Sequence, residues 1–207
     1  MRILVFGASG AVGSRVVQEA VGRGHQVTTV SRSPALRPSA HHRQGDASDP
    51  EDVAALSEGH DVVISATRPR PGLEGELVDA AKGLLLGLRG SGVRLILVGG
   101  AASLLVPGLE VPLLETPDFP ASLLPIALAC NEQYDLVRAG TGIDWTYVSP
   151  PALLEPGVRT GRYRLGRDHL VTADDGSSSI SMEDFAIALV DEAEQARHRR
   201  TRFTVGN

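Results

Sequence analysis

Three glycines near the start of the chain, Gly7, Gly10 and Gly13, have the three-residue spacing of a loop that binds the phosphates of a dinucleotide. They follow the apolar run 3–6 and precede a helical pattern, which is the context in which this spacing is meaningful. The first glycine allows a tight turn, the second lets the backbone approach a pyrophosphate, and the third lets the helix pack closely on the strand. The alternative is a tight turn that holds no ligand. The predicted phosphate-binding residues are Gly7, Ser9, Gly10, Ala11, Val12 and Gly13.

The residues that follow the second apolar run, Ser31 and Arg32, bear on the choice of cofactor. NAD-selective sites usually place Asp or Glu here, where the carboxylate accepts hydrogen bonds from the ribose hydroxyls. A guanidinium instead pairs with a 2′-phosphate through two charge-assisted hydrogen bonds. Arg32 therefore favours NADP, and the alternative is an ordinary solvated loop arginine.

Five further residues are predicted to lie along the cofactor. Asp46 can accept from the adenine amino group, with Ala47 against the ring; a turn aspartate that bonds its own backbone is an equally good interpretation. Ala66 and Thr67 end an apolar run and should pass under the adenine ribose by topology alone. Gly99 ends the next run, where a bulky side chain would crowd a cofactor.

The elements that must position these residues alternate along the chain. Short apolar runs rich in β-branched residues are typical of buried parallel strands, and the segments between them have helical periodicity. Asp49 is a predicted N-cap followed by Pro50 at the first helical position, and Gly24 stands where a left-handed C-cap belongs. The predicted strands cover 3–6, 26–30, 61–66, 94–99 and 144–149, with a short strand before Asp46; the predicted helices cover 11–23, 74–89, 124–139 and 182–197, with a short helix from Asp49.

This alternation predicts an α/β fold of Rossmann type, a doubly wound parallel β-sheet with helices on both faces. Ligands of such sheets bind beyond the carboxyl ends of the strands. The proline-rich stretch 104–125 has no clear period and is predicted to be a long loop over the cleft. We expect one domain over 1–207, with 150–180 as a small substrate-side extension within it.

Composition excludes several classes of protein. The net charge of -5 over 207 residues leaves no basic footprint for nucleic acid or an anionic membrane surface. Cys130 is the single cysteine, so an internal disulfide and thiolate-pair zinc sites are excluded and a reducing cytoplasm fits. No apolar run reaches the roughly 18 uncharged residues of a membrane span. We expect a cytoplasmic monomer or homodimer that acts on a small molecule, without nucleic acid, membrane or metal.

Several sequence motifs carry a family resemblance over nearly the whole chain. They are the glycine loop, SRSP, GDASD, DVVISA, VGGAASL, DWTYVSPPALLEPG, GRYRLG, ISMEDFAIALVDEAE and RFTVGN. With them the chain resembles an atypical branch of the short-chain dehydrogenase/reductase superfamily, closest to NADH-flavin-reductase-like, NmrA-like and biliverdin-reductase-B-like proteins. That branch contains flavin and quinone reductases, biosynthetic enzymes and proteins that only sense the redox state of their nucleotide.

The resemblance implies roles for residues at the reacting end. Ser149 and Pro150 would lie near the nicotinamide, and Ser103 is similar to a serine near the reacting end in this branch. Other enzymes of the superfamily use a Tyr-x-x-x-Lys pair as the acid, but here Tyr134 is followed by Arg138, so a lowered tyrosine pKa is not implied. Tyr134 is interpreted as a packed aromatic and Cys130 as a small buried hydrophobe.

The sequence favours an NADPH-dependent reductase that passes hydride to a flavin, a quinone or a similar conjugated acceptor, with the flavin as a substrate. Two alternatives remain open. One is a regulatory protein that senses NADP without turnover, and the other is a specialised biosynthetic enzyme of the same fold, including one with no net redox change. Arg68 and Arg70 could face an anionic substrate or the pyrophosphate, or belong to a solvated loop.

Overall fold

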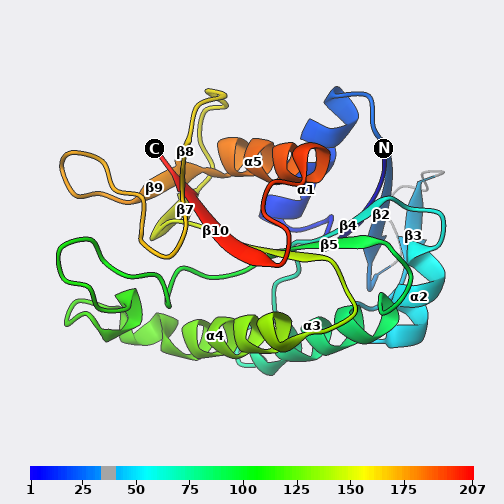
Figure 1. The fold of residues 1–207 in the computed structure, drawn as a ribbon, viewed down its shortest axis with the longest axis horizontal. Coiled ribbons are helices and arrows are strands. Elements are labelled where there is room, and N and C mark those ends of the chain that lie inside the picture. Colours follow the sequence, from blue (N-terminus) through cyan, green and yellow to red (C-terminus); the bar gives the residue numbers. More distant parts are fainter. Residues whose placement is uncertain (34–40) are drawn as a thin grey trace.

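An eight-stranded sheet forms the centre of the structure, a computed structural model that describes residues 1–33 and 41–207 (Figure 1). Its strand order is β3-β2-β1-β4-β5-β6-β10-β8. The strands are β1 Arg2–Phe6, β2 Gln26–Ser31, β3 His42–Gln44, β4 Val62–Ser65, β5 Arg94–Val98, β6 Trp145–Ser149, β8 Arg164–Gly166 and β10 Thr201–Gly206. All neighbours pair in parallel except β8, which runs antiparallel to β10 at the edge. The predicted fold class is confirmed.

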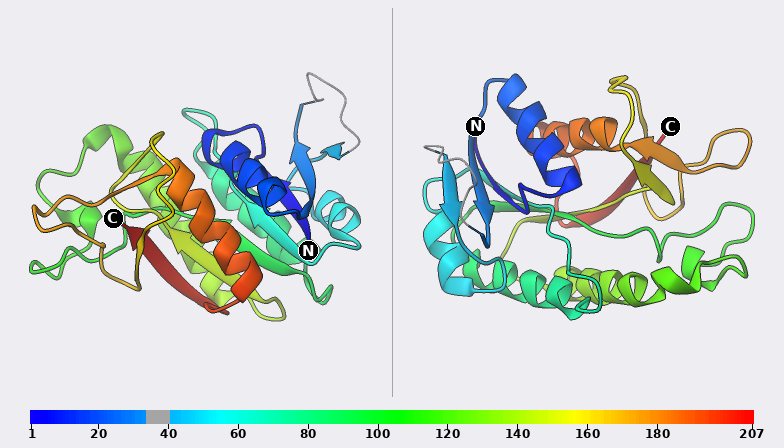
Figure 2. Two further views of the ribbon diagram at one scale, coloured as in Figure 1. Left: turned by 90° about the horizontal axis from the view of Figure 1, so that it is seen from above. Right: turned by 180° about the vertical axis from the view of Figure 1, so that it is seen from behind.

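Helices cover both faces of this sheet (Figures 1 and 2). Helices α1 Ala11–Gly22 and α5 Met182–Gln195 pack on one face, and α2 Pro50–Ser57, α3 Gly75–Gly87 and α4 Leu124–Ala139 pack on the other. Successive side chains of a strand point to opposite faces. Ile3 of β1 therefore belongs to the core under α1 and α5, and Leu4 belongs to the core under α2, α3 and α4. Among the described residues, no helix combines the length and the apolar character needed to cross a membrane.

The helix ends follow the capping signals of the sequence. The Asp49 carboxylate accepts from the backbone N–H of Glu51 at 2.9 Å and caps α2. The Ser181 hydroxyl accepts from the N–H of Asp184 at 3.0 Å and caps α5. Gly24, just beyond α1, has a φ of 81°, the left-handed conformation expected of a C-cap glycine.

The segment between β6 and α5 contains short strands that the sequence patterns did not predict. Strand β7 Leu153–Glu155 pairs with β9 Ser179–Ser181 in a separate two-stranded sheet. The 104–125 stretch is an ordered connection with two 3₁₀ turns, Leu113–Glu115 and Ala121–Leu123. Leu105 fastens it to the later loop, because its N–H donates to the carbonyl of Asp168 at 2.8 Å.

Candidate functional site

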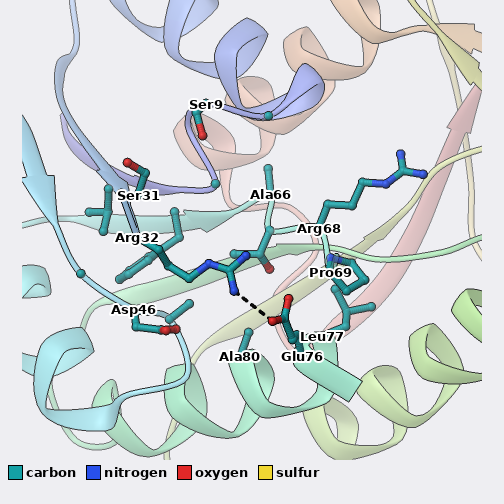
Figure 3. A pocket seen from close by; sticks show the side chains of 17 residues that line it. Ser9, Ser31, Arg32, Asp46, Ala66, Arg68, Pro69, Glu76, Leu77 and Ala80 are labelled. Atoms are coloured by element: carbon teal, nitrogen blue, oxygen red, sulfur yellow. Dashed lines mark hydrogen bonds and ion pairs between the residues drawn. The ribbon is translucent and has the colours of Figure 1, made fainter. Parts of the chain in front are cut away.

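A cavity opens at the carboxyl ends of β1, β2 and β4, where a doubly wound sheet binds ligands (Figure 3). Part of its wall comes from α3, through Glu76, Leu77 and Ala80. Nine residues predicted from the sequence line this one cavity: Gly7, Ser9, Gly10, Ser31, Arg32, Asp46, Ala47, Ala66 and Thr67. The fold thus brings together segments from four separate stretches of the chain.

The three loop glycines are needed for different reasons. Gly7 has a φ of 75°, and a Cβ there would lie 2.4 Å from the carbonyl oxygen of Ala66. A Cβ on Gly13 would lie 2.1 Å from the carbonyl oxygen of Gly7. Gly10 is less confined, since the nearest atom to its Cβ would be the Gly7 oxygen at 3.2 Å. Gly7 and Gly13 are therefore required by the fold itself, whereas Gly10 keeps the cavity side of the loop free of a side chain.

The first turn of α1 is left open for an anion. Gly10 is the N-cap residue, so no side chain caps this helix, and no acidic residue lies in its first turn. The first N–H groups of a helix have no partner within it and carry a partial positive charge. Asp49 and Ser181 satisfy such groups in helices α2 and α5, whereas no side chain caps the start of α1. This arrangement fits a pyrophosphate.

Arg32 crosses the cavity and meets a carboxylate on α3 (Figure 3). Its Nη1 donates to Oε1 of Glu76 at 3.1 Å, and the side chain is 49% exposed. Arg70 holds the same carboxylate, since its Nε donates to Oε1 at 2.8 Å and its backbone N–H to Oε2 at 3.1 Å. The Arg70 guanidinium, with a smaller contribution from Arg32, lowers the pKa of Glu76 to about 2. Two arginines thus share one permanently charged anion at the cavity.

The sequence interpretation missed Glu76, although the residue opens the helix predicted over 74–89. The sequence signal that could have identified Glu76 is its place in the first turn of a helix, directly after a loop that contains two arginines. Arg70 pairs with Glu76, whereas Arg68 lines the cavity and extends away from the Arg32–Glu76 pair (Figure 3). A contact of Arg68 with an anionic substrate or with the pyrophosphate stays a prediction.

Asp46 makes the turn that was one of its two interpretations. Its Oδ1 accepts from the backbone N–H of Ser48 at 2.9 Å and from the Ser48 hydroxyl at 2.8 Å. The residue also lines the cavity, next to the buried Ala47. A contact between Asp46 and an adenine stays a prediction.

Three further predicted residues lie outside the cavity lining: Gly99 directly after β5, Ser149 at the end of β6 and Pro150 directly after β6. A Cβ on Gly99 would lie 2.0 Å from the ring of Tyr147, so packing explains this glycine and crowding of a cofactor is not needed to explain it. Ser149 is fully buried and its hydroxyl has no hydrogen-bond partner in the described part of the chain. Pro150 is partly buried. The nicotinamide contacts expected of Ser149 and Pro150 stay predictions.

Ser103, in the turn after β5, contacts Arg202, a residue that the sequence analysis did not single out. Nη1 of Arg202, on β10, donates to its Oγ at 2.9 Å. From the sequence, Ser103 could also simply bond the neighbouring loop. The hydrogen bond in the structure instead joins it to β10. The run RFTVGN marks a family likeness, but its spacing gives no sign that Arg202 reaches the end of another strand.

Tyr134 and Cys130 are both partly buried in the structure. The ring of Tyr134 lies 4.8 Å from the ring of Tyr147, centre to centre. Burial raises the pKa of the Cys130 thiol to about 11, so this group remains protonated near neutral pH. The Tyr147 hydroxyl lies 3.0 Å from the carbonyl oxygen of Cys130, and burial raises its pKa well above the usual value. The raised pKa values of Cys130 and Tyr147 make both groups poor proton donors near neutral pH.

Comparisons with known proteins agree with this geometry. A family model described as NAD(P)H-binding matches residues 7–196. The protein YwnB of Bacillus subtilis (strain 168) is 37% identical over 212 residues, which cover 99% of this chain and 98% of YwnB. SP1627 of Streptococcus pneumoniae TIGR4, named as a proposed NADH-flavin reductase, is 34% identical with a TM-score of 0.90 over 100% of this chain and 99% of its own.

A protein of Bacteroides thetaiotaomicron, named as a proposed epimerase, is 39% identical with a TM-score of 0.88 over 99% of this chain and 96% of its own. These relatives share the fold and differ in the activity that their names suggest. The open glycine loop, the uncapped start of α1 and the arginines at the cavity fit a nicotinamide dinucleotide. The chain belongs to the NAD(P)H-binding family.

Proposed function

We propose that the protein is an NADPH-dependent reductase that passes hydride to a flavin, a quinone or a similarly conjugated small molecule. The observation that carries this proposal is a dinucleotide-binding fold whose reacting end offers the Ser103 hydroxyl and lacks a Tyr-x-x-x-Lys pair. The name of SP1627, a proposed NADH-flavin reductase, supports an acceptor of this class.

The cavity residues would hold the cofactor from its adenosine end. The glycine loop and the amides of Ala11, Val12 and Gly13 would bind the pyrophosphate, and Arg32 would bind the 2′-phosphate. Ala47 and Ala66 would contact the adenosine. When bound, the nicotinamide supplies a hydride.

A conjugated acceptor makes small demands on a protein acid. It takes hydride into a delocalised system and can draw its proton from solvent. The protein must then orient the acceptor and offer a hydrogen bond to the oxygen on which negative charge develops. Ser103, partly exposed in the turn after β5, is suited to that task. The absence of the lysine of a Tyr-x-x-x-Lys pair should therefore have little effect on the rate of reduction.

The acceptor class is tested by steady-state oxidation of NADPH with FMN, riboflavin and a quinone. We expect turnover with at least one of them, and a change of less than about tenfold in Tyr134→Phe because that ring is packed and no positioned acid is lost. No oxidation above background, despite tight NADPH binding, would favour a nucleotide sensor or a specialised biosynthetic enzyme. A collapse of activity in Tyr134→Phe would show that Tyr134 is the acid.

The choice of cofactor is tested at Arg32. NADPH should bind more tightly than NADH, and Arg32→Ala should weaken NADPH by about 1.5–3 kcal/mol, or about 10- to 150-fold, because a charged hydrogen-bond partner of the 2′-phosphate is lost. NADH should be almost unaffected. Titration calorimetry of both nucleotides measures this, with Arg89→Ala, an exposed arginine at the other end of α3, as the matched control.

A companion variant tests the contact seen in the structure. Glu76→Gln removes the carboxylate that a 2′-phosphate must displace from Arg32, so it should change NADPH affinity in the opposite direction, towards tighter binding. Equal losses for both nucleotides in Arg32→Ala would remove Arg32 from the 2′-phosphate site.

A further inference from the structure

The side chain next to Ser103 is a buried cation from a distant strand. Nη1 of Arg202 donates to Oγ of Ser103 at 2.9 Å, and Nη2 donates to Oδ1 of Asp168 at 2.7 Å. The guanidinium carbon lies 4.6 Å from the centre of the Tyr134 ring. Strand β10 thus brings a positive charge to Ser103 and to the ring of Tyr134.

Because the Arg202 guanidinium is buried, solvent weakens its effect on Ser103 only a little. The Arg202 side chain is 8% exposed, whereas that of its partner Asp168 is 56% exposed. Solvent screens the exposed Asp168 carboxylate more than the buried Arg202 guanidinium. The carboxylate therefore cancels only part of the positive charge that acts on Ser103. Nε of Arg202 is buried without a hydrogen-bond partner in the described part of the chain, which leaves part of the cation uncompensated.

The contact also restricts the directions open to the Ser103 hydroxyl hydrogen. Because Oγ of Ser103 accepts from Arg202, the hydroxyl hydrogen must point elsewhere, and Ser103 donates to no described residue. The turn is held in place from the next residues, since Leu105 bonds the backbone of both Asp168 and Leu170. Ser103 is therefore presented as a hydrogen-bond donor at the carboxyl edge of the sheet.

We infer that Arg202 is a positioning residue that orients the Ser103 hydroxyl toward the hydride acceptor and places a positive charge behind it. This inference rests on the proposed function. The acceptor would gain a hydride, that is, two electrons and one proton, from the reduced nicotinamide, which is oxidised, and a second proton from solvent would complete the reduction of the acceptor. Before that proton arrives the acceptor carries a negative charge. A hydroxyl polarised by Arg202 stabilises that charge on the oxygen it contacts.

A thiol at position 103 measures the effect without cofactor or acceptor. In the Ser103→Cys variant, made in a Cys130→Ala background, the ultraviolet absorbance of the thiolate is followed against pH. A cation in hydrogen-bond range favours the thiolate, so we expect the thiol pKa to fall about 1–3 units below the usual value of about 8.5. Adding Arg202→Gln should raise it again by about one unit or more, and Arg202→Lys, which keeps the charge, should leave it low.

Two results would overturn the inference. One is a position-103 thiol that titrates at or above its usual pKa with Arg202 present, and the other is the same pKa in the Gln and Lys variants. Thermal unfolding identifies variants that do not fold. If neither position-202 variant folds, the titration with Arg202 in place decides alone.

Steady-state kinetics distinguish a failure of the Arg202 inference from a failure of the proposed function. With a reducible acceptor, Arg202→Gln should lower kcat about tenfold at unchanged NADPH affinity, and Arg202→Lys should recover part of the loss. Arg167→Ala, an exposed arginine near the same loop, is the matched control and should behave as the unmodified protein. A lowered thiol pKa without turnover on any acceptor would reject the acceptor class and keep the Arg202 effect; turnover with an ordinary thiol pKa would reject Arg202 alone.

Discussion

Replacing Gly10 with valine is expected to abolish nucleotide binding while the protein stays folded. A Cβ at this position would meet the Gly7 carbonyl oxygen at 3.2 Å and the Ala66 carbonyl oxygen at 3.9 Å, so the loop must give by only a few tenths of an ångström. The valine side chain would fill the cavity side of the loop, where the pyrophosphate must approach the backbone. Calorimetry with NADPH and NADH, beside circular dichroism melts, measures both parts of this result.

Two other glycines calibrate the experiment. Gly22→Val changes the same helix where no atom lies within 4 Å of the new Cβ, so binding should persist. Gly13→Val forces a Cβ to 2.1 Å from the Gly7 carbonyl oxygen, so this variant should lose stability as well as binding. A folded Gly10→Val protein that binds both nucleotides normally would mean that the phosphates lie elsewhere.

Removing the Ser103 hydroxyl is expected to lower kcat strongly, by up to the roughly 10²–10³-fold seen when one catalytic hydrogen-bond donor is lost. The hydroxyl is the donor that Arg202 orients, and alanine leaves both the acceptor and the guanidinium without it. Cofactor affinity should hardly change, because Ser103 lies outside the cavity that Arg32 lines. Steady-state kinetics with the best acceptor and NADPH titrations measure the two quantities.

Ser122→Ala serves as the control for that experiment. Ser122 is exposed in the same connection between β5 and α4, so its loss should leave kcat unchanged. Activity in Ser103→Ala within about threefold of the unmodified protein would assign the hydrogen bond to the acceptor to another group.

The elements of this fold that carry their own local signals could be predicted from the sequence. Helix α4 has the predicted bounds, and α2 and α5 begin at the capping residues Asp49 and Ser181. Strand β10 was not predicted, and its pairing partners, β6 and β8, are remote in the sequence. The same applies to the three-residue strands β7, β8 and β9, whose pairing is decided by tertiary contacts.

The candidate site divides in the same way. The glycine loop is contiguous, so spacing alone predicts it. Arg32 meets Glu76 across 44 positions, and Ser103 meets Arg202 across 99 positions. Such partners are chosen by how strands and helices pack. A single sequence indicates that Arg32 and Ser103 are polar groups at strand ends, but it cannot say which side chain completes each of them.

The cavity and the segment around Ser103 are built from different parts of the chain, so substitutions in one should have little effect on the other. Arg32 is tied to α3 through Glu76, whereas Ser103 is tied to β10 through Arg202. Changes at sites with separate partners usually have additive free energies. In a double variant, the loss in cofactor affinity and the loss in turnover should therefore be independent of each other. Substitutions in the segment after β5 can then change which acceptor is used while the affinity for the dinucleotide stays the same.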